Sequence, residues 1–251
     1  MTLARLVAIM QRLRDPAHGC EWDRAQDFAS IAPYTIEEAY EVADAIARGD
    51  MSALADELGD LQLQVVFHAQ MASETGLFTL DEVITGICDK LERRHPHIFG
   101  DTDASPGWEA LKAAERDGLE DKSALAGVAL ALPALERAVK LQRRAARTGF
   151  DWPDASGPRA KIDEELVEIE TAVPGDRAEE VGDLLFAVTN FARHMNVDPE
   201  EALRQANRKF ERRFRLIEKT PGFGELTLDE MEECWQAAKA LENAPNSPET
   251  V

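Results

Sequence analysis

The sequence is short of positive charge. It has 28 Lys and Arg residues against 48 Asp and Glu residues, which gives a formal net charge of −20. Because nucleic-acid backbones are bound by basic surfaces, this excess of acidic residues argues against nucleic acid as a partner. It does not exclude a nucleotide whose phosphates bind together with a divalent metal ion.

The sequence also lacks long apolar runs and paired cysteines. Because no stretch of about 18 apolar residues is present, no membrane span is expected. The amphipathic N-terminus, "MTLARLVAIMQRLRDP", has no small-residue cleavage site, so we interpret it as a structural helix and not as a signal. Cys20, Cys88 and Cys234 are odd in number and far apart, which indicates reduced thiols and a cytoplasmic protein.

Strand patterns are missing as well, since no stretch of four or more residues shows a persuasive strand alternation. Helical periodicity is broken mainly at Gly, Pro and Asx residues, which predicts an all-α fold. The expected helices span residues 2–14, 35–48, 51–74, 79–94, 105–118, 133–147, 158–173, 176–196, 198–219 and 227–242.

The pattern of helices repeats along the chain. "EEAYEVADAI" (37–46) resembles "EELVEIETAV" (164–173), and "DELGDLQLQVV" (56–66) resembles "EEVGDLLFAVT" (179–189). "DKLERRH" and "WEALK" are echoed, in the same order, by "RKFERRF" and "WQAAK". We therefore predict two tandem copies of one helical-bundle module, at 1–118 and 133–243, with a connector at 119–132 and a disordered tail at 244–251.

Each copy contains a helical hairpin with four carboxylates. In the first, Glu38 and Glu41 lie on one helix, and Glu57 and Asp60 lie on the next. A spacing of three places each pair on one helix face, and both cross-pairs are centred on Gly49, so the two pairs stand at matching heights. In the second copy, Glu165, Glu168, Glu180 and Asp183 repeat this relation about Pro174-Gly175.

The alternative to a site is that these glutamates are solvated surface residues. Against this, the pattern occurs on both arms of a hairpin and twice in the chain. Gly59 and Gly182 also stand inside the second helix of each hairpin, where glycine costs about 1 kcal/mol and suggests the close approach of another group. We therefore interpret the two clusters as sites.

Clustered carboxylates raise one another's pKa unless a cation is present. Ligation by oxygen alone suits Mg²⁺ or Mn²⁺. A di-iron site is a weaker alternative, because neither hairpin has the Glu-x-x-His pattern. A zinc site made by Cys20, His95 and His97 is also weak, because no CxxC-like spacing supports it.

Basic and aromatic residues repeat together with the carboxylates. Lys and Arg can hold phosphate oxygens, and Trp offers a stacking face for a base. Taken alone, each would be interpreted as a solvated or core residue. The repeated set is Lys209, Arg213, Trp235 and Lys239 in the second copy, with Lys90, Arg94, Trp108 and Lys112 in the first.

On these motifs the chain resembles the MazG nucleoside triphosphate pyrophosphohydrolases, an all-α family. EExxE followed by ExxD stands at 37–41 with 57–60 and again at 164–168 with 180–183, and "GCEWD", "SIAPYT" and "KLERRHPH" extend the resemblance over nearly the whole chain. The resemblance implies Mg²⁺-dependent hydrolysis of nucleoside triphosphates to monophosphate and pyrophosphate, with broad tolerance of NTPs and dNTPs, a house-cleaning role and a homodimer.

The resemblance also assigns roles to residues of the second copy, which it implies is the main catalytic one. Glu165, Glu168, Glu180 and Asp183 would bind metal, with one glutamate activating water. Lys209 and Arg213 would bind phosphates, and Trp235 and Lys239 would close over the nucleotide. A non-catalytic acidic scaffold that binds a partner protein and a phosphoribosyl-ATP pyrophosphohydrolase-like enzyme remain as alternatives.

Overall fold

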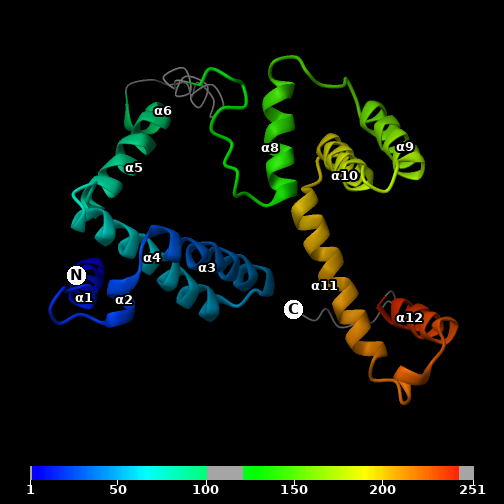
Figure 1. Ribbon diagram of the computed structural model, residues 1–251, viewed down its shortest axis with the longest axis horizontal. Helices are drawn as coiled ribbons and strands as arrows, with labels where there is room; N and C mark the ends of the chain where they lie inside the picture. The colour runs from blue at the N-terminus through cyan, green and yellow to red at the C-terminus, as the bar shows by residue number, and fades with distance from the viewer. Residues whose placement is uncertain (1, 101–120, 243–251) are drawn as a thin grey trace. The chain divides into compact units, whose positions relative to one another are not determined.

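A computed structural model describes residues 2–100 and 121–242 of the chain (Figure 1). Among these residues every regular element is a helix, which confirms the predicted all-α class with two tandem modules. The predicted helix at 105–118 lies outside the described residues, as do Trp108 and Lys112. No described helix has the length and apolar character needed to cross a membrane.

The chain divides into two compact units, Met1–Lys112 and Ala113–Pro248. The described helices of the first unit are α1 (Thr2–Leu13), α2 (Glu21–Ala25), α3 (Phe28–Arg48), α4 (Met51–Glu74), α5 (Leu80–Arg94) and α6 (Pro96–Phe99). Those of the second are α8 (Ala134–Ala146), α9 (Ser156–Thr171), α10 (Arg177–His194), α11 (Pro199–Ile217), the short 3-10 helix η1 (Phe223–Glu225) and α12 (Leu228–Glu242). The domain boundaries given above stay a prediction.

Local sequence explains the first hairpin. Helix α3 begins at Phe28 and not at residue 35 as predicted, because Asp27 and Ser30 form a capping box that starts it upstream of Pro33. It ends at Gly49, whose φ of 68° is a left-handed conformation that glycine adopts without strain. The Asp50 side chain then accepts hydrogen bonds from the first turn of α4. The predicted turn at Gly49 is therefore confirmed.

The first unit has a hydrophobic core where α1 and α3 pack on α4. Met10, Ile31, Val66, Phe67 and Met71 are at most 3% exposed and form one cluster. Arg14 closes this core at the edge, with its guanidinium 2.8 Å from Glu74 of α4. The core thus packs the C-terminal half of α4, whereas Glu57 and Asp60 lie in its N-terminal half.

The second unit is built on the α9–α10 hairpin, against which α8 packs. Its buried residues are mostly small or polar, among them Ala138, Ala187 and Thr189. The loop before α9 is held by Asp151, which pairs with Arg193 of α10 at 2.5 Å. Trp152 lies so close to Gly157 that a Cβ there would be 2.1 Å from the indole, so only glycine fits at the start of α9.

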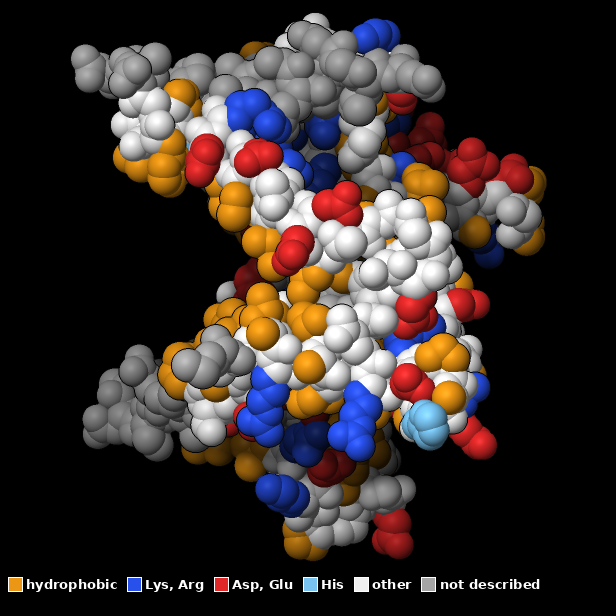
Figure 2. Space-filling model, turned by 90° about the vertical axis from the view of Figure 1, so that its left-hand side faces the viewer, with side chains coloured by type: hydrophobic (Ala, Val, Ile, Leu, Met, Phe, Trp, Pro, Cys, Tyr) orange, Lys and Arg blue, Asp and Glu red, His pale blue; other side chains and the backbone are white. Residues whose placement is uncertain are grey.

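Many large apolar side chains remain exposed in both units. The face drawn in Figure 2 carries a broad area of hydrophobic side chains with acidic and basic ones between them. In the second unit, Phe210 and Leu185 are more than half exposed, at 58% and 53%. Apolar surface of this kind marks faces that bind a partner or a ligand.

Candidate functional site

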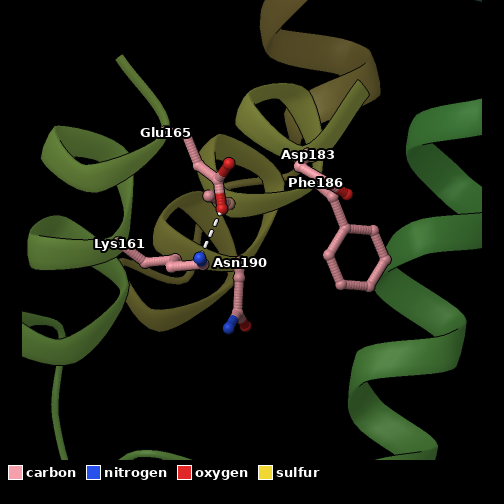
Figure 3. A pocket seen from close by; sticks show the side chains of 6 residues that line it. Lys161, Glu165, Asp183, Phe186 and Asn190 are labelled. Atoms are coloured by element: carbon pink, nitrogen blue, oxygen red, sulfur yellow. Dashed lines mark ion pairs between the residues drawn. The ribbon is translucent and has the colours of Figure 1, made fainter. Parts of the chain in front are cut away.

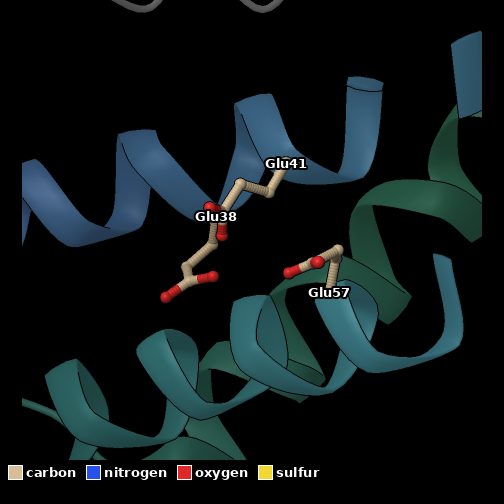
Figure 4. Close-up of side chains that lie close together, drawn as sticks. All are labelled: Glu38, Glu41 and Glu57. Carbon is tan, nitrogen blue, oxygen red and sulfur yellow. The ribbon is translucent and has the colours of Figure 1, made fainter. Parts of the chain in front are cut away.

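The first hairpin brings three of its four carboxylates together. Figure 4 shows Glu38 and Glu41 extending from α3 toward Glu57 on α4. One carboxylate oxygen from each lies within 4.8 Å of the others. Burial, and then the charges of Asp60 and Glu41, raise the pKa of Glu38, and burial followed by the charge of Glu41 raises the pKa of Glu57. The predicted matching of heights across the hairpin is thus observed.

The second hairpin forms the same cluster in a more buried setting. Oxygens of Glu165, Glu168 and Glu180 lie within 4.8 Å of one another. Glu165 is only 2% exposed, whereas its counterpart Glu38 is half-buried. A hydrogen bond with Glu165, followed by burial, raises the pKa of Glu168. Three carboxylates at this distance in a partly dry site favour a proton or a cation among them.

The Glu165 carboxylate is only half satisfied by the described residues. Its Oε1 forms an ion pair with Lys161, one turn earlier on α9, with 2.7 Å between Oε1 and Nζ. Its Oε2 is buried and has no hydrogen-bond partner among the described residues. A buried carboxylate oxygen without a donor is costly, so the site suits a bound cation.

A cavity of about 260 Å³ adjoins this cluster. It is lined by Lys161, Glu165, Asp183, Phe186, Ala187 and Asn190. Figure 3 shows the Lys161 ammonium directed toward Glu165, and Asn190 beneath it. The second carboxylate cluster therefore stands at the wall of a polar cavity.

The two aspartates of the predicted sets lie at the edge of the clusters. Neither Asp60 nor Asp183 joins its three-glutamate group, and both side chains are exposed. Asp60 is nevertheless near enough for its charge to raise the pKa of Glu38. Asp183 lines the cavity. Their roles as metal ligands stay a prediction.

The basic and aromatic residues of the second unit gather on α11 and α12. The Arg213 guanidinium lies 5.6 Å from the centre of the Trp235 ring and 2.7 Å from Glu242, while Lys209 is exposed and Lys239 is half-buried. In Figure 1, α11 runs away from the α9–α10 hairpin and α12 packs along its far half. Within the described part of the unit, the cavity beside Glu165 is lined by none of these four residues.

The first unit shows the same separation. Lys90 and Arg94 lie on α5, which follows the C-terminal end of α4, while Glu57 lies near the N-terminal end of that helix. Lys90 is exposed and Arg94 is half-buried. The roles assigned to these two basic residues therefore stay a prediction.

The interpretation of the glycines stays a prediction, because the described residues do not use the space beside them. Gly59 and Gly182 were expected to permit the close approach of another group. A Cβ at either position would meet no atom of the described residues within 4 Å. Any group that uses this space must come from outside the described chain.

Sequence reasoning missed Lys161 and Asn190. Lys161 precedes Glu165 by four residues, and Asn190 follows Asp183 by seven, so helical spacing places both beside the carboxylates. The counterparts in the first hairpin are Tyr34 and Phe67. An alignment of the two copies could have revealed both residues, because the second copy has a charged or amide side chain where the first has an aromatic one.

Comparisons with known proteins agree with the duplicated carboxylate motif. The family model of the MazG nucleotide pyrophosphohydrolase domain matches residues 26–99, and that of phosphoribosyl-ATP pyrophosphohydrolase matches residues 132–210. Each match contains one carboxylate hairpin.

Three relatives illustrate how far the likeness extends. A nucleoside triphosphate pyrophosphohydrolase of Escherichia coli (strain K12) is 50% identical, over 95% of this chain and 97% of its own length. A nucleoside triphosphate pyrophosphohydrolase/pyrophosphatase MazG of Thermotoga maritima is 47% identical, over 93% and 94%. One from Mycobacterium tuberculosis is 36% identical, over 59% and 46%. From the two nearly full-length matches and the duplicated carboxylate motif, the chain belongs to the MazG family of nucleotide pyrophosphohydrolases.

Proposed function

We propose that this protein hydrolyses nucleoside triphosphates to nucleoside monophosphate and pyrophosphate, and that the carboxylate cluster of the second unit carries the reaction with Mg²⁺. The names of the full-length relatives support the reaction class. The observation that carries the choice of site is the buried Glu165, whose Oε2 has no hydrogen-bond partner among the residues that the structure describes and lies beside two further glutamates.

The residues of the cluster fit a divalent cation. The ligand atoms are carboxylate oxygens, which suit both Mg²⁺ and Mn²⁺. One of them, Oε2 of Glu165, is buried and receives no hydrogen bond from the described part of the chain. Glu165, Glu168 and Glu180 would hold the ion, with Asp183 at its edge. When bound, the ion would neutralise charge on the triphosphate and lower the pKa of a bound water.

The chain's own residues supply the rest of the chemistry. Glu168, whose pKa is raised by its contact with Glu165 and by burial, can take up a proton from the attacking water. Lys161 holds Glu165 in place through the contact at 2.7 Å, and its charge offsets part of the negative charge at the site. Phosphoanhydride hydrolysis depends mainly on such positioning and charge neutralisation.

A second copy of the chain would complete the site. Lys209 and Arg213 lie on the part of α11 that leads to α12, away from the carboxylates of their own unit. We therefore infer a homodimer in which these residues reach the phosphates bound by the other subunit. The exposed apolar side chains, such as Phe210, fit burial in that interface. A monomeric mass in sedimentation analysis of active protein would contradict this.

Phosphoribosyl-ATP is a second candidate substrate. It is favoured by one observation, the match of residues 132–210 to the family model of phosphoribosyl-ATP pyrophosphohydrolase. The full-length relatives favour nucleoside triphosphates instead. For these we propose broad acceptance of ribo- and deoxyribonucleotides and a house-cleaning role in the cytoplasm, where the unpaired Cys20, Cys88 and Cys234 would stay reduced.

A substrate panel tests the proposal. Pyrophosphate release is measured from NTPs, dNTPs and phosphoribosyl-ATP, with Mg²⁺, with Mn²⁺ and with chelator. We expect release from several triphosphates with either metal and none with chelator. Release from phosphoribosyl-ATP alone would shift the assignment to the second candidate. No release from any compound would leave the acidic scaffold as the better interpretation.

A further inference from the structure

The cavity contains two side chains that the carboxylate chemistry leaves unused. Phe186 and Asn190 lie on α10, one and two turns after Asp183. Phe186 offers an apolar ring, and Asn190 offers an amide that is only 7% exposed. A cavity of about 260 Å³ is slightly below the usual size of small-molecule pockets, so it suits one ring system and not a whole nucleotide.

The orientation of the Asn190 amide is fixed by its neighbour. Its Oδ1 accepts a hydrogen bond from Nε of Arg193 at 2.9 Å. Because a guanidinium can only donate, the oxygen of the amide must face Arg193, and both N–H groups remain for the other side. Asn190 therefore presents donors, and not an acceptor, to a ligand.

Arg193 is itself held in place. Its Nη1 and Nη2 donate to the two carboxylate oxygens of Asp151 at 2.9 and 2.5 Å, and His194 lies 3.0 Å from the same carboxylate. This fork-to-fork pairing fixes the guanidinium plane. Asp151 thus orients Arg193, and Arg193 in turn fixes which end of the Asn190 amide points to the cavity.

We propose that Asn190 determines base preference, by donating hydrogen bonds to the keto oxygen of a base that stacks against Phe186. The proposal rests on the proposed function and names the favoured substrates: triphosphates of bases with a keto group where adenine and cytosine have an amino group. An amino group there would meet the Asn190 donors without an acceptor, and unpaired buried donors are costly. The first unit has Tyr34 and Phe67 at the positions of Lys161 and Asn190, so it has no amide donor at the second of these positions.

Two matched pairs of substrates isolate this group. ITP differs from ATP by a 6-keto for a 6-amino group, and UTP differs from CTP in the same way at position 4. With the wild-type protein we expect kcat/KM for the keto member of each pair to be higher by about five- to tenfold. A ratio near one in both pairs would overturn the proposal.

Asn190→Asp sharpens the test, because the aspartate keeps a partner for Arg193 and offers only acceptors to the cavity. We expect the preference to invert toward ATP and CTP. Asn190→Leu should bring both ratios close to one, and Asn207→Leu, the same change at an exposed position on α11, should leave them unchanged. Circular dichroism establishes that each variant is folded.

The outcomes separate this inference from the proposed function. If the wild type releases no pyrophosphate from any triphosphate, the proposed function fails. If it does release pyrophosphate, but Asn190→Asp changes kcat/KM equally for both members of each pair, only the role of Asn190 is overturned.

Discussion

The two hairpins have the same carboxylates but different surroundings. In each, three glutamates approach within 4.8 Å. In the first unit, a cavity of about 130 Å³ is lined mainly by apolar and aromatic residues such as Met10, Ile31 and Phe67, and by none of the three glutamates. In the second unit, a cavity of about 260 Å³ is lined by Glu165 of the cluster together with Lys161 and Asn190. The two copies therefore share the carboxylate motif and differ in the cavity that accompanies it.

The contrast extends to how each unit is stabilised. The first has a cluster of large buried apolar residues where α1, α3 and α4 meet. The second buries mostly small and polar residues, among them Glu165, Gln142 and Asn190. Polar groups at such positions contribute less to stability than apolar ones, so the second unit has less stabilising core packing than the first.

The largest expected effect is on activity, from the same substitution at equivalent glutamates of the two clusters. Glu168→Gln should reduce pyrophosphate release by about 100- to 1000-fold, because it removes an anionic ligand and a proton acceptor at once. The matched Glu41→Gln should leave turnover within about twofold, since the cavity of the first unit has Tyr34 and Phe67 at the positions of Lys161 and Asn190. Steady-state kinetics with Mg²⁺ measures both, and circular dichroism checks the fold.

The reverse result would be equally clear. Unchanged turnover in Glu168→Gln would sink the assignment of catalysis to the second unit. A large loss in Glu41→Gln would mean that both clusters work.

The next effect concerns stability at equivalent positions. Phe67→Ala should cost about 3–5 kcal/mol, because Phe67 is 3% exposed in the apolar core. Asn190→Ala should cost only about 1 kcal/mol, the worth of one hydrogen bond to Arg193. Hydrogen exchange followed by mass spectrometry, peptide by peptide, assigns each loss to its unit. Equal losses would refute the difference in packing drawn above.

The smallest effects concern the Arg–carboxylate pair of each unit. Arg193 lowers the pKa of Asp151 from 3.8 to about 2, and Arg14 lowers the pKa of Glu74. A carboxyl group whose pKa is lower in the folded than in the unfolded state stabilises the fold at pH values above its unfolded pKa. This stabilisation is lost as pH falls through the folded pKa. Asp151→Asn should therefore cost about 1–2 kcal/mol at pH 7, with the difference from wild type shrinking below about pH 4 and vanishing only below about pH 2.

Glu74→Gln is the matched change in the first unit. It should weaken α1 and α4 in the same direction, again only above the acid range. Denaturant unfolding at pH 7, at about pH 4 and at about pH 1.5, which lies below the folded pKa of Asp151, measures both when it is followed by hydrogen exchange in each unit. A difference that persists at the lowest pH would show that packing, and not charge, explains the loss.

Periodicity and turn chemistry predicted the helices that carry the carboxylates. The turn at Gly49 occurs as the residues indicated, with the glycine as a left-handed helix cap. The start of α3 was missed because the Asp27–Ser30 box lies upstream of Pro33, which was taken as a break. Short helices such as α2 were missed because one turn has no detectable period.

The candidate site was predicted less completely. Spacing about Gly49 fixed the heights of Glu41 and Glu57, and the observed cluster confirms that arrangement. Spacing could not show that α11 would carry Arg213 away from the carboxylates, because helix direction after a turn depends on packing. Spacing does place Asn190 beside the carboxylates, but it could not show the contact with Arg193 that orients the Asn190 amide.

Gly59 and Gly182 are also positions at which the stability of the protein could be engineered. Each lowers helix stability by roughly 0.5–1 kcal/mol relative to alanine, and a Cβ at either would meet no described atom within 4 Å. Alanine at Gly59 should thus be a simple gain in thermostability. Alanine at Gly182 should give the same gain while narrowing the space beside the carboxylates to which we assign catalysis. If that assignment holds, activity should fall for Gly182→Ala and not for Gly59→Ala, and the pair would measure the stability that the second hairpin gives up.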